Sequence, residues 1–152
     1  MTRGRRAAPE ADRPRAGVAR RLILDTGVLM AAEGGKAPVD AVIEDADDVA
    51  IAAITVAELL VSVEMDDAAR RPNRQAFVDE VLALIPIEEY TTDVARVHAR
   101  LMAHVRREGK SRGAYDLLIA ATAAATARTV ITMDASAAFD DLPGVRAQVV
   151  PR

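Results

Sequence analysis

Residues 22–27 read LILDTG, a short aliphatic run that ends in an acid, a threonine and a glycine. Such a run is typical of a central β-strand, and the polar residues after it indicate where the strand opens into a loop. Residues 129–134 read TVITMD and repeat this pattern of an aliphatic run closed by an acid. We therefore expect two strands that each deliver an aspartate, Asp25 or Asp134, at the carboxyl end.

The segments around these two strands alternate between helical and strand patterns. Helices are predicted from Pro38, over 55–65 and 72–84, from Thr91 or Thr92 to Gly109, and over 114–127; further short strands are predicted over 49–52, near 86–87 and over 149–150. Alternation of this kind predicts an α/β fold with a central parallel β-sheet flanked by helices on both faces, in three α/β/α layers. In a parallel sheet the two aspartates would meet at the same edge, where such sheets bind ligands.

The composition restricts the class of protein. A chain of 152 residues fits one domain, and with 51% hydrophobic but only 3% aromatic residues its core must be built from aliphatic side chains. There is no cysteine, which excludes disulfides, thiolate metal sites and a thiol nucleophile. Neither a membrane span nor a signal peptide is evident, so a cytoplasmic location is expected.

The charge is segregated along the chain. Residues 1–21 hold seven arginines against Glu10 and Asp12, a balance of +5, whereas the whole chain carries −3 and the remainder therefore −8. We divide the sequence into a basic arm over residues 1–20 and a domain over 21–152. A disordered tail is the first interpretation of the arm, and an RNA-attracting segment or a wrongly assigned start codon are the alternatives.

Four acids interrupt apolar stretches: Asp25, Glu58, Asp116 and Asp134. Each also has a purely structural interpretation. Glu58 could complete a capping box with Thr55, Asp116 could favour the dipole in the first turn of its helix, and the other two could cap the elements that follow them. Together, four carboxylates at the ends of elements would repel one another strongly, and a divalent cation would relieve that repulsion.

The available ligands indicate which cation. Oxygen donors without cysteine favour Mg²⁺ or Mn²⁺ over structural Zn²⁺, and such an ion suits phosphodiester hydrolysis. His98 and His104 are six residues apart, hence on opposite faces of a helix, and are interpreted as surface or partly packed residues. Asp93 is interpreted as a charge at a helix N-terminus and not as a fifth site residue.

The segments that carry these acids also resemble a known family. In order they read LILDTGVLM (22–30), ITVAELLVS (54–62), GAYDLLIAATA (113–123) and VITMDASAAF (130–139). This series is similar to PIN-domain ribonucleases, in particular to VapC-like toxins of type II toxin–antitoxin modules. The resemblance implies a PIN-like α/β/α sandwich, a Mg²⁺- or Mn²⁺-dependent endoribonuclease, a homodimer and inhibition by a cognate antitoxin.

The resemblance also suggests a role for each acid. Asp25 and Asp116 resemble direct metal ligands, and Glu58 and Asp134 resemble acids that complete the site directly or through water. Two hydroxyls, those of Thr26 and Thr132, are expected to orient these carboxylates. RNA contacts are expected from the basic stretch before Asp116 and the tyrosine beside it, for which a solvated helix end is the alternative: Arg106, Arg107, Lys110, Arg112 and Tyr115.

Two other functions remain open at this point. Asp25-Thr26-Gly27 matches the signature of retropepsin-like aspartic proteases, but those enzymes are almost wholly β and would leave the other three acids without roles. The same fold could also serve as a non-catalytic docking or RNA-binding module. Failure to bind Mn²⁺ would favour that module.

Overall fold

A computed structural model describes residues 19–35 and 43–152 of the chain. The helix expected from Pro38 and nearly all of the basic arm lie outside these residues. The strands are β1 (Arg21–Leu24), β2 (Asp48–Ala52), β3 (Ile87–Glu88), β4 (Thr129–Thr132) and β5 (Ala147–Val149). The helices are α1 (Thr26–Glu33), α3 (Ala53–Glu64), α4 (Arg71–Leu84), α5 (Thr92–Glu108) and α6 (Ala114–Ala125), with short 3₁₀ turns η2 (Ala135–Ala137) and η3 (Phe139–Asp141).

All strand pairs in the sheet are parallel, in the order β3-β2-β1-β4-β5. From β1 the chain builds outward through β2 and β3, then returns to the other side of β1 for β4 and β5. The direction of winding therefore reverses between β1 and β4. At such a switch point the connections leave the sheet in opposite directions and open a crevice beyond the carboxyl ends of the strands.

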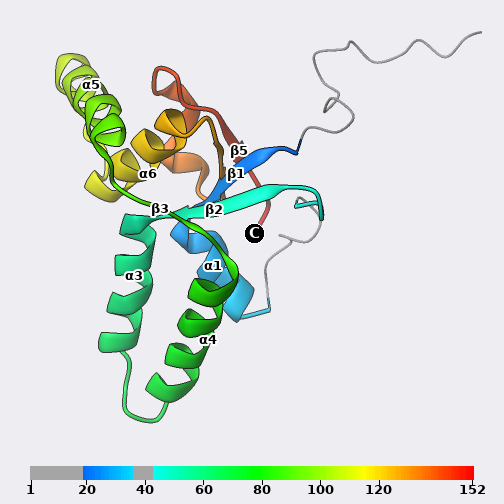
Figure 1. The fold of residues 1–152 in the computed structure, drawn as a ribbon. Helices are drawn as coiled ribbons and strands as arrows, with labels where there is room; N and C mark the ends of the chain where they lie inside the picture. Colours follow the sequence, from blue (N-terminus) through cyan, green and yellow to red (C-terminus); the bar gives the residue numbers. More distant parts are fainter. Residues whose placement is uncertain (1–18, 36–42) are drawn as a thin grey trace, which may run out of the picture.

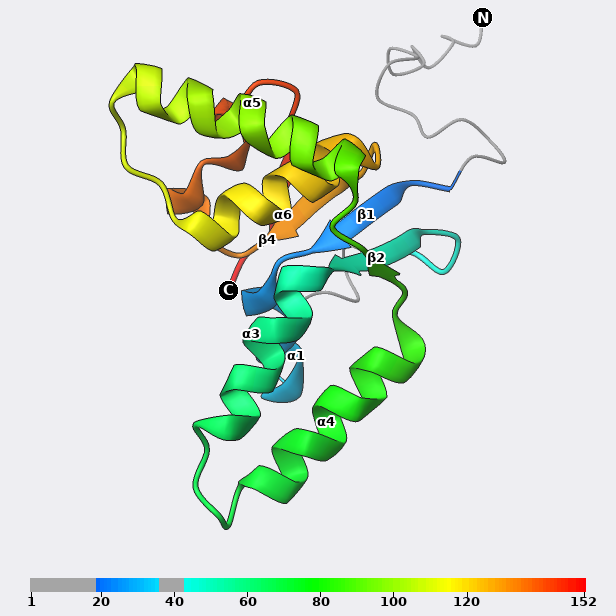
Figure 2. The same cartoon turned by 60° about the vertical axis from the view of Figure 1, so that its left-hand side comes forward.

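The sheet is covered on both faces (Figure 1). Helices α5 and α6 lie on one face and α1, α3 and α4 on the other, as Figure 2 shows from the side. Alternate residues of each strand feed the two cores: Ile23 and Val130 belong to the core beneath α5 and α6, whereas Leu24 and Ile131 belong to the opposite core. The predicted three-layer α/β/α architecture is confirmed.

The local signals in the sequence end the elements near the expected residues. The Thr91 side chain caps α5, and Gly109 ends it with a left-handed backbone at φ 66°. Asp93 lies in the first turn of α5, as expected. The last helix stops at Ala125, two residues before its expected end, and the last strand is Ala147–Val149 instead of 149–150. No helix in the described ranges is long and apolar enough to cross a membrane.

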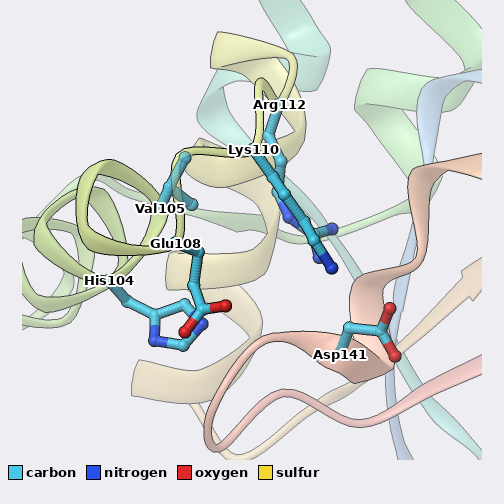
Figure 3. Close-up of a pocket in the computed structure, with 6 residues that line it drawn as sticks. All are labelled: His104, Val105, Glu108, Lys110, Arg112 and Asp141. Carbon is cyan, nitrogen blue, oxygen red and sulfur yellow. The ribbon is translucent and has the colours of Figure 1, made fainter.

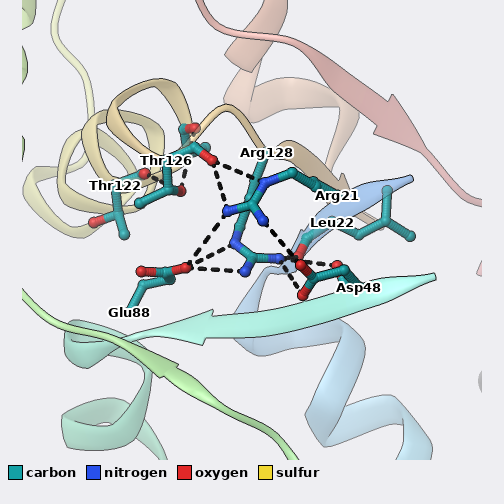
Figure 4. Close-up of polar contacts among 8 residues, drawn as sticks. Arg21, Leu22, Asp48, Glu88, Thr122, Thr126 and Arg128 are labelled. Atoms are coloured by element: carbon teal, nitrogen blue, oxygen red, sulfur yellow. Dashed lines mark hydrogen bonds and ion pairs between the residues drawn. The ribbon is translucent and has the colours of Figure 1, made fainter. Parts of the chain in front are cut away.

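A buried arginine joins three neighbouring strands on the side of the sheet opposite the crevice (Figure 4). Arg128, only 5% exposed, donates to the main-chain oxygens of Leu22 and Asp48 and forms ion pairs with the carboxylates of Asp48 and Glu88. Its guanidinium thus connects the starts of β1 and β2 to β3. Replacement of Arg128 would leave each of these oxygens without its charged donor. Arg128 should therefore contribute more to the free energy of unfolding than an exposed arginine does.

Arg128→Met should lower the free energy of unfolding by about 2–3 kcal/mol, because it leaves partly buried carboxylates and carbonyls without their donor. Urea denaturation at neutral pH measures the change. Arg100→Met on the exposed face of α5 is the matched control, with an expected loss below about 0.5 kcal/mol. Equal losses in the two variants would refute the stabilising role of the Arg128 network.

Candidate active site

Asp25 leaves the end of β1 and is held at both carboxylate oxygens. Its Oδ1 accepts from the backbone N–H of Thr26 at 2.8 Å, which caps α1. Its Oδ2 accepts from the hydroxyl of Thr132, 107 residues away in sequence, also at 2.8 Å. That hydroxyl oxygen accepts in turn from the backbone N–H of Asp134 at 3.0 Å. The buried Thr132 therefore joins the two aspartates that follow β1 and β4.

Glu58 approaches the same edge from α3. The hydroxyl of Thr26 donates to Glu58 Oε1 at 2.7 Å, so each threonine contacts one of the acids. The capping box with Thr55 is wrong, because the helix begins at Ala53, two residues earlier than the pattern indicated. Thr55 is fully buried inside the first turn and caps nothing. Glu58 is thus free of the structural role that the sequence offered for it.

Asp116 lies in the first turn of α6, three residues after Gly113, the N-cap of that helix. A Cβ atom on Gly113 would stand 3.1 Å from Asp116 Oδ2, tighter than ordinary van der Waals contact. The absence of a side chain at Gly113 therefore leaves room for the carboxylate beside its own helix N-terminus.

Asp134 has a local structural role in addition to its place beside Thr132. Its Oδ1 accepts from the backbone N–H and the hydroxyl of Ser136, and so caps the turn η2. These hydrogen bonds lower the pKa of Asp134, because they favour the ionised form. The residue is a carboxylate at neutral pH.

The other three acids are shifted in the opposite direction. Burial raises the pKa of Asp25, Glu58 and Asp116, and the charges of neighbouring acids raise each pKa further. Asp25 is raised by Asp134, Glu58 by Asp25 and Asp116, and Asp116 by Asp25 and Asp134. The four carboxylates therefore form one electrostatic cluster, in which the negative charge of Asp25, Glu58 and Asp116 is unfavourable.

The surface above the cluster is hollowed in a continuous series. One hollow of about 360 Å³ is lined by Asp25 and Asp134, a second of about 300 Å³ by Asp134 and Asp116, and a third of about 310 Å³ by Asp116 and Glu58. Each shares an acid with the next. The acids thus line a series of neighbouring hollows beyond the switch point of the sheet.

The donor set fits a hard divalent cation, which prefers carboxylate oxygen and would offset the mutual repulsion of the acids. In the described part of the chain, however, no three side chains of the metal-binding types are already spaced as ligands of one ion. Glu58 and Asp25 are instead turned to their threonine partners. The residues are suited to a metal by chemistry and position, and binding would require rotations of their side chains.

A family model of the PIN domain matches residues 22–144, which include all four acids. The chain belongs to the PIN-domain family. It is 38% identical over 115 residues to ribonuclease VapC5 of Mycobacterium tuberculosis, covering 74% of this chain and 82% of that protein. It is 29% identical over 131 residues to ribonuclease VapC of Rickettsia bellii, covering 86% of this chain and 96% of that protein.

A solved structure agrees with the PIN-domain assignment. The structure of VapBC-5 from Mycobacterium tuberculosis, a member of the VapBC family of toxin–antitoxin systems, has a chain that superposes with a TM-score of 0.71 and 33% identity. The match covers 86% of this chain and 98% of that one. The parallel sheet of a PIN domain excludes the aspartic protease, whose Asp-Thr-Gly turn belongs to a β fold; here Thr26 and Gly27 begin helix α1.

The basic residues of this PIN domain divide into two groups. Arg106 and Arg107 are exposed in the last turn of α5, whereas Lys110 and Arg112 line the hollow that contains Asp116 and Asp134. Lys110 and Arg112 also extend toward Asp141 of η3 across a neighbouring hollow of about 350 Å³, which His104 on α5 also lines (Figure 3). Two of the four expected basic side chains therefore reach the acidic cluster.

The sequence did not predict the structural role of Arg112. Its guanidinium donates to the carbonyls of Ala137 at 2.7 Å and Ala138 at 3.0 Å, the latter a non-glycine residue at φ 46°. The contact fixes the loop before Asp116 to the turn after Asp134. Gly113 was missed as well, and Arg152, which lines the hollow of Asp25 and Asp134, gives no signal in the sequence.

Asp116→Asn should stabilise the metal-free domain at neutral pH. A raised folded-state pKa means that the fold binds a proton more tightly than the unfolded chain, so ionisation of Asp116 costs stability as pH rises above its ordinary value of 3.8. Solvent in the hollow screens the effect, so we expect a gain in Tm of roughly 2–4 °C. The gain should vanish at pH values below 3.8, where both states are protonated.

Thermal unfolding in EDTA, from neutral pH to values below 3.8, measures the gain in Tm of Asp116→Asn. Asp45→Asn, on the exposed stretch before β2, serves as the control and should leave Tm nearly unchanged. A variant Asp116→Asn that is less stable than the parent protein at neutral pH would contradict the electrostatic description of the cluster.

Proposed function

We propose that this PIN-domain chain is a Mg²⁺- or Mn²⁺-dependent endoribonuclease. The observation that carries the proposal is the convergence of four acids from four different elements beyond the switch point of the sheet. Three of the four have raised pKa values, so their charges are held together at a cost in stability. Unfavourable arrangements of this kind are typical of functional sites.

Each acid has a role in this proposal. Asp25 and Asp116 bind the cation directly, and Glu58 and Asp134 complete the site directly or through water. When bound, the cation supplies charge stabilisation for the phosphate and an activated water for its hydrolysis. Thr26 and Thr132 position Glu58 and Asp25 beside the hollow, from where the two carboxylates turn to reach the cation.

The positive side chains beside the acids favour RNA as the substrate. Lys110 and Arg112 line the same hollow as Asp116, where they can pair with phosphates on either side of the bond that is cut. We further propose that Arg106 and Arg107, exposed at the end of α5, attract the more distant backbone. Arg112 also has a structural role, because it hydrogen-bonds the carbonyls of Ala137 and Ala138.

The biological setting proposed for this nuclease is a toxin–antitoxin pair, with a small cognate antitoxin that covers the acids. The names of the relatives and the VapBC-5 structure support this setting. A homodimer is also proposed. Exposed apolar side chains on α3 and α4 or directly after α3, such as Leu60, Leu84 and Met65, are available for such contacts.

Purified protein free of antitoxin should cleave RNA with Mg²⁺ or Mn²⁺ and not with EDTA. Asp25→Asn and Asp116→Asn should each lower the cleavage rate at least about 100-fold, because each removes a charged ligand. Gel analysis of total and structured RNA measures cleavage, and isothermal titration with Mn²⁺ measures metal binding independently.

Asp93→Asn is the matched control for this experiment. Asp93 lies in the first turn of α5 and pairs with Arg96 away from the hollows, so its loss should leave cleavage unchanged. Cleavage that persists in both site variants would refute the site and indicate a contaminating nuclease. Absence of Mn²⁺ binding would favour the non-catalytic docking module.

Induced expression of the chain without its antitoxin should arrest the growth of a bacterial host. The growth curve of the Asp25→Asn strain should follow the empty vector, because the proposed toxicity depends on RNA cleavage. Equal amounts of both proteins, checked by immunoblot, are required for the comparison. Arrest by both forms would separate toxicity from the four acids.

A further inference from the structure

Tyr115 is the exposed aromatic residue next to the acidic cluster. The chain has two phenylalanines and two tyrosines and no tryptophan. Phe139 is buried and Phe77 packs against the core, while Tyr90 hydrogen-bonds His98 and contacts its ring. Tyr115, by contrast, is 55% exposed and makes no ring contact within the described residues. In the part of the chain that the structure describes, no hydrogen bond of its hydroxyl and no contact with another ring accounts for its position.

The tyrosine forms one wall of an apolar hollow of about 210 Å³. The other walls come from one face of α3 and are Ile54, Ala57 and Val61, with Glu58 at the rim. Val61 is 58% exposed, so its apolar surface is open to a ligand in the hollow. The hollow thus combines a flat aromatic side with aliphatic walls.

This apolar hollow is continuous with the acidic one. Glu58 and Tyr115 line both, and Asp116 and Gly113 lie on the acidic side. A phosphate held among the acids would therefore place an adjoining nucleotide of the same strand beside Tyr115. Unpaired bases have apolar faces that stack on aromatic side chains irrespective of their sequence.

We propose that Tyr115, Ile54, Ala57 and Val61 form a subsite for one unpaired nucleobase of the RNA, next to the bond that is cut. The inference rests on the proposed nuclease function and adds a substrate requirement to it. The base beside the cut must be unstacked from its neighbours, so the chain acts on single-stranded or loop RNA. Lys110 and Arg112, on the other side of Asp116, take the continuing backbone.

Base stacking can be measured without cleavage. Short single-stranded RNAs of mixed sequence, each with one 2-aminopurine, are titrated into the Asp25→Asn variant, in which cutting is blocked. Quenching of the 2-aminopurine fluorescence reports stacking on the ring. We expect quenching with Asp25→Asn, its retention when Tyr115→Phe is added, and its loss when Tyr115→Ala is added. Unchanged quenching with Tyr115→Ala would overturn the subsite.

Cleavage kinetics give a second, independent measurement. With a pool of random single-stranded RNA, Tyr115→Ala should raise KM by about 5- to 150-fold and flatten the base preference next to the cut, whereas Tyr115→Phe should behave like the parent protein. Tyr90→Ala removes the other exposed tyrosine, away from the acids, and should change neither quantity.

The outcomes separate this inference from the proposed function. Cutting by Tyr115→Ala with an unchanged KM and base preference would overturn the subsite and leave the nuclease intact. The same result together with weakened binding of an antitoxin would assign the hollow to a protein side chain instead. Absence of both metal-dependent cutting and RNA quenching in every form would overturn the proposed function and the subsite with it.

Discussion

The parallel pairing of β1 with β4 is the constraint on which the site depends. Leu24 lies opposite Ile131, and the backbone N–H of Asp25 continues the ladder to the carbonyl of Ile131 at 2.9 Å. This register brings the Thr132 hydroxyl to the Asp25 carboxylate. A slip of one residue would turn every side chain of the shifted strand to the opposite face and separate the two aspartates. The chemistry of the crevice is therefore specified by the hydrogen bonds of the sheet.

The electrostatics of the crevice oppose the stability of the fold. Buried carboxylates near one another raise each other's pKa, and no lysine or arginine forms a salt bridge with any of the four acids in the described ranges. On the opposite side of the sheet, by contrast, the charge of Arg128 is paired with the carboxylates of Asp48 and Glu88 and with main-chain oxygens. Charges are thus paired on one side of the sheet, whereas on the other side the acids repel one another. A loss of stability at this place is expected where the acids serve function and not folding.

The strands, most helix limits and the convergence of Asp25 and Asp134 could be predicted from local patterns. The strands that end in an acid could be recognised from local sequence, without information on distant contacts. The parallel α/β class followed from the alternation of helical and strand patterns. The start of α3 could not be predicted, because Ala52 and Ala53 carry no cap and burial of Thr55 overrides its preference for a helix end. The burial of Arg128 and the bonds from Arg112 to the η2 turn depend on partners 25 to 106 residues away. Such contacts leave no periodic signal.

The direct passage from β2 into α3 constrains how the chain can vary. Ala52 ends the strand and Ala53 begins the helix, so Glu58 is placed by rigid geometry counted from the sheet. One inserted residue in this junction would rotate the carboxylate by roughly 100° about the helix axis, away from Thr26. Residues 65–70, which join α3 to α4, can change in number without such an effect. At this junction the number of residues is therefore more tightly constrained than the identity of the side chains.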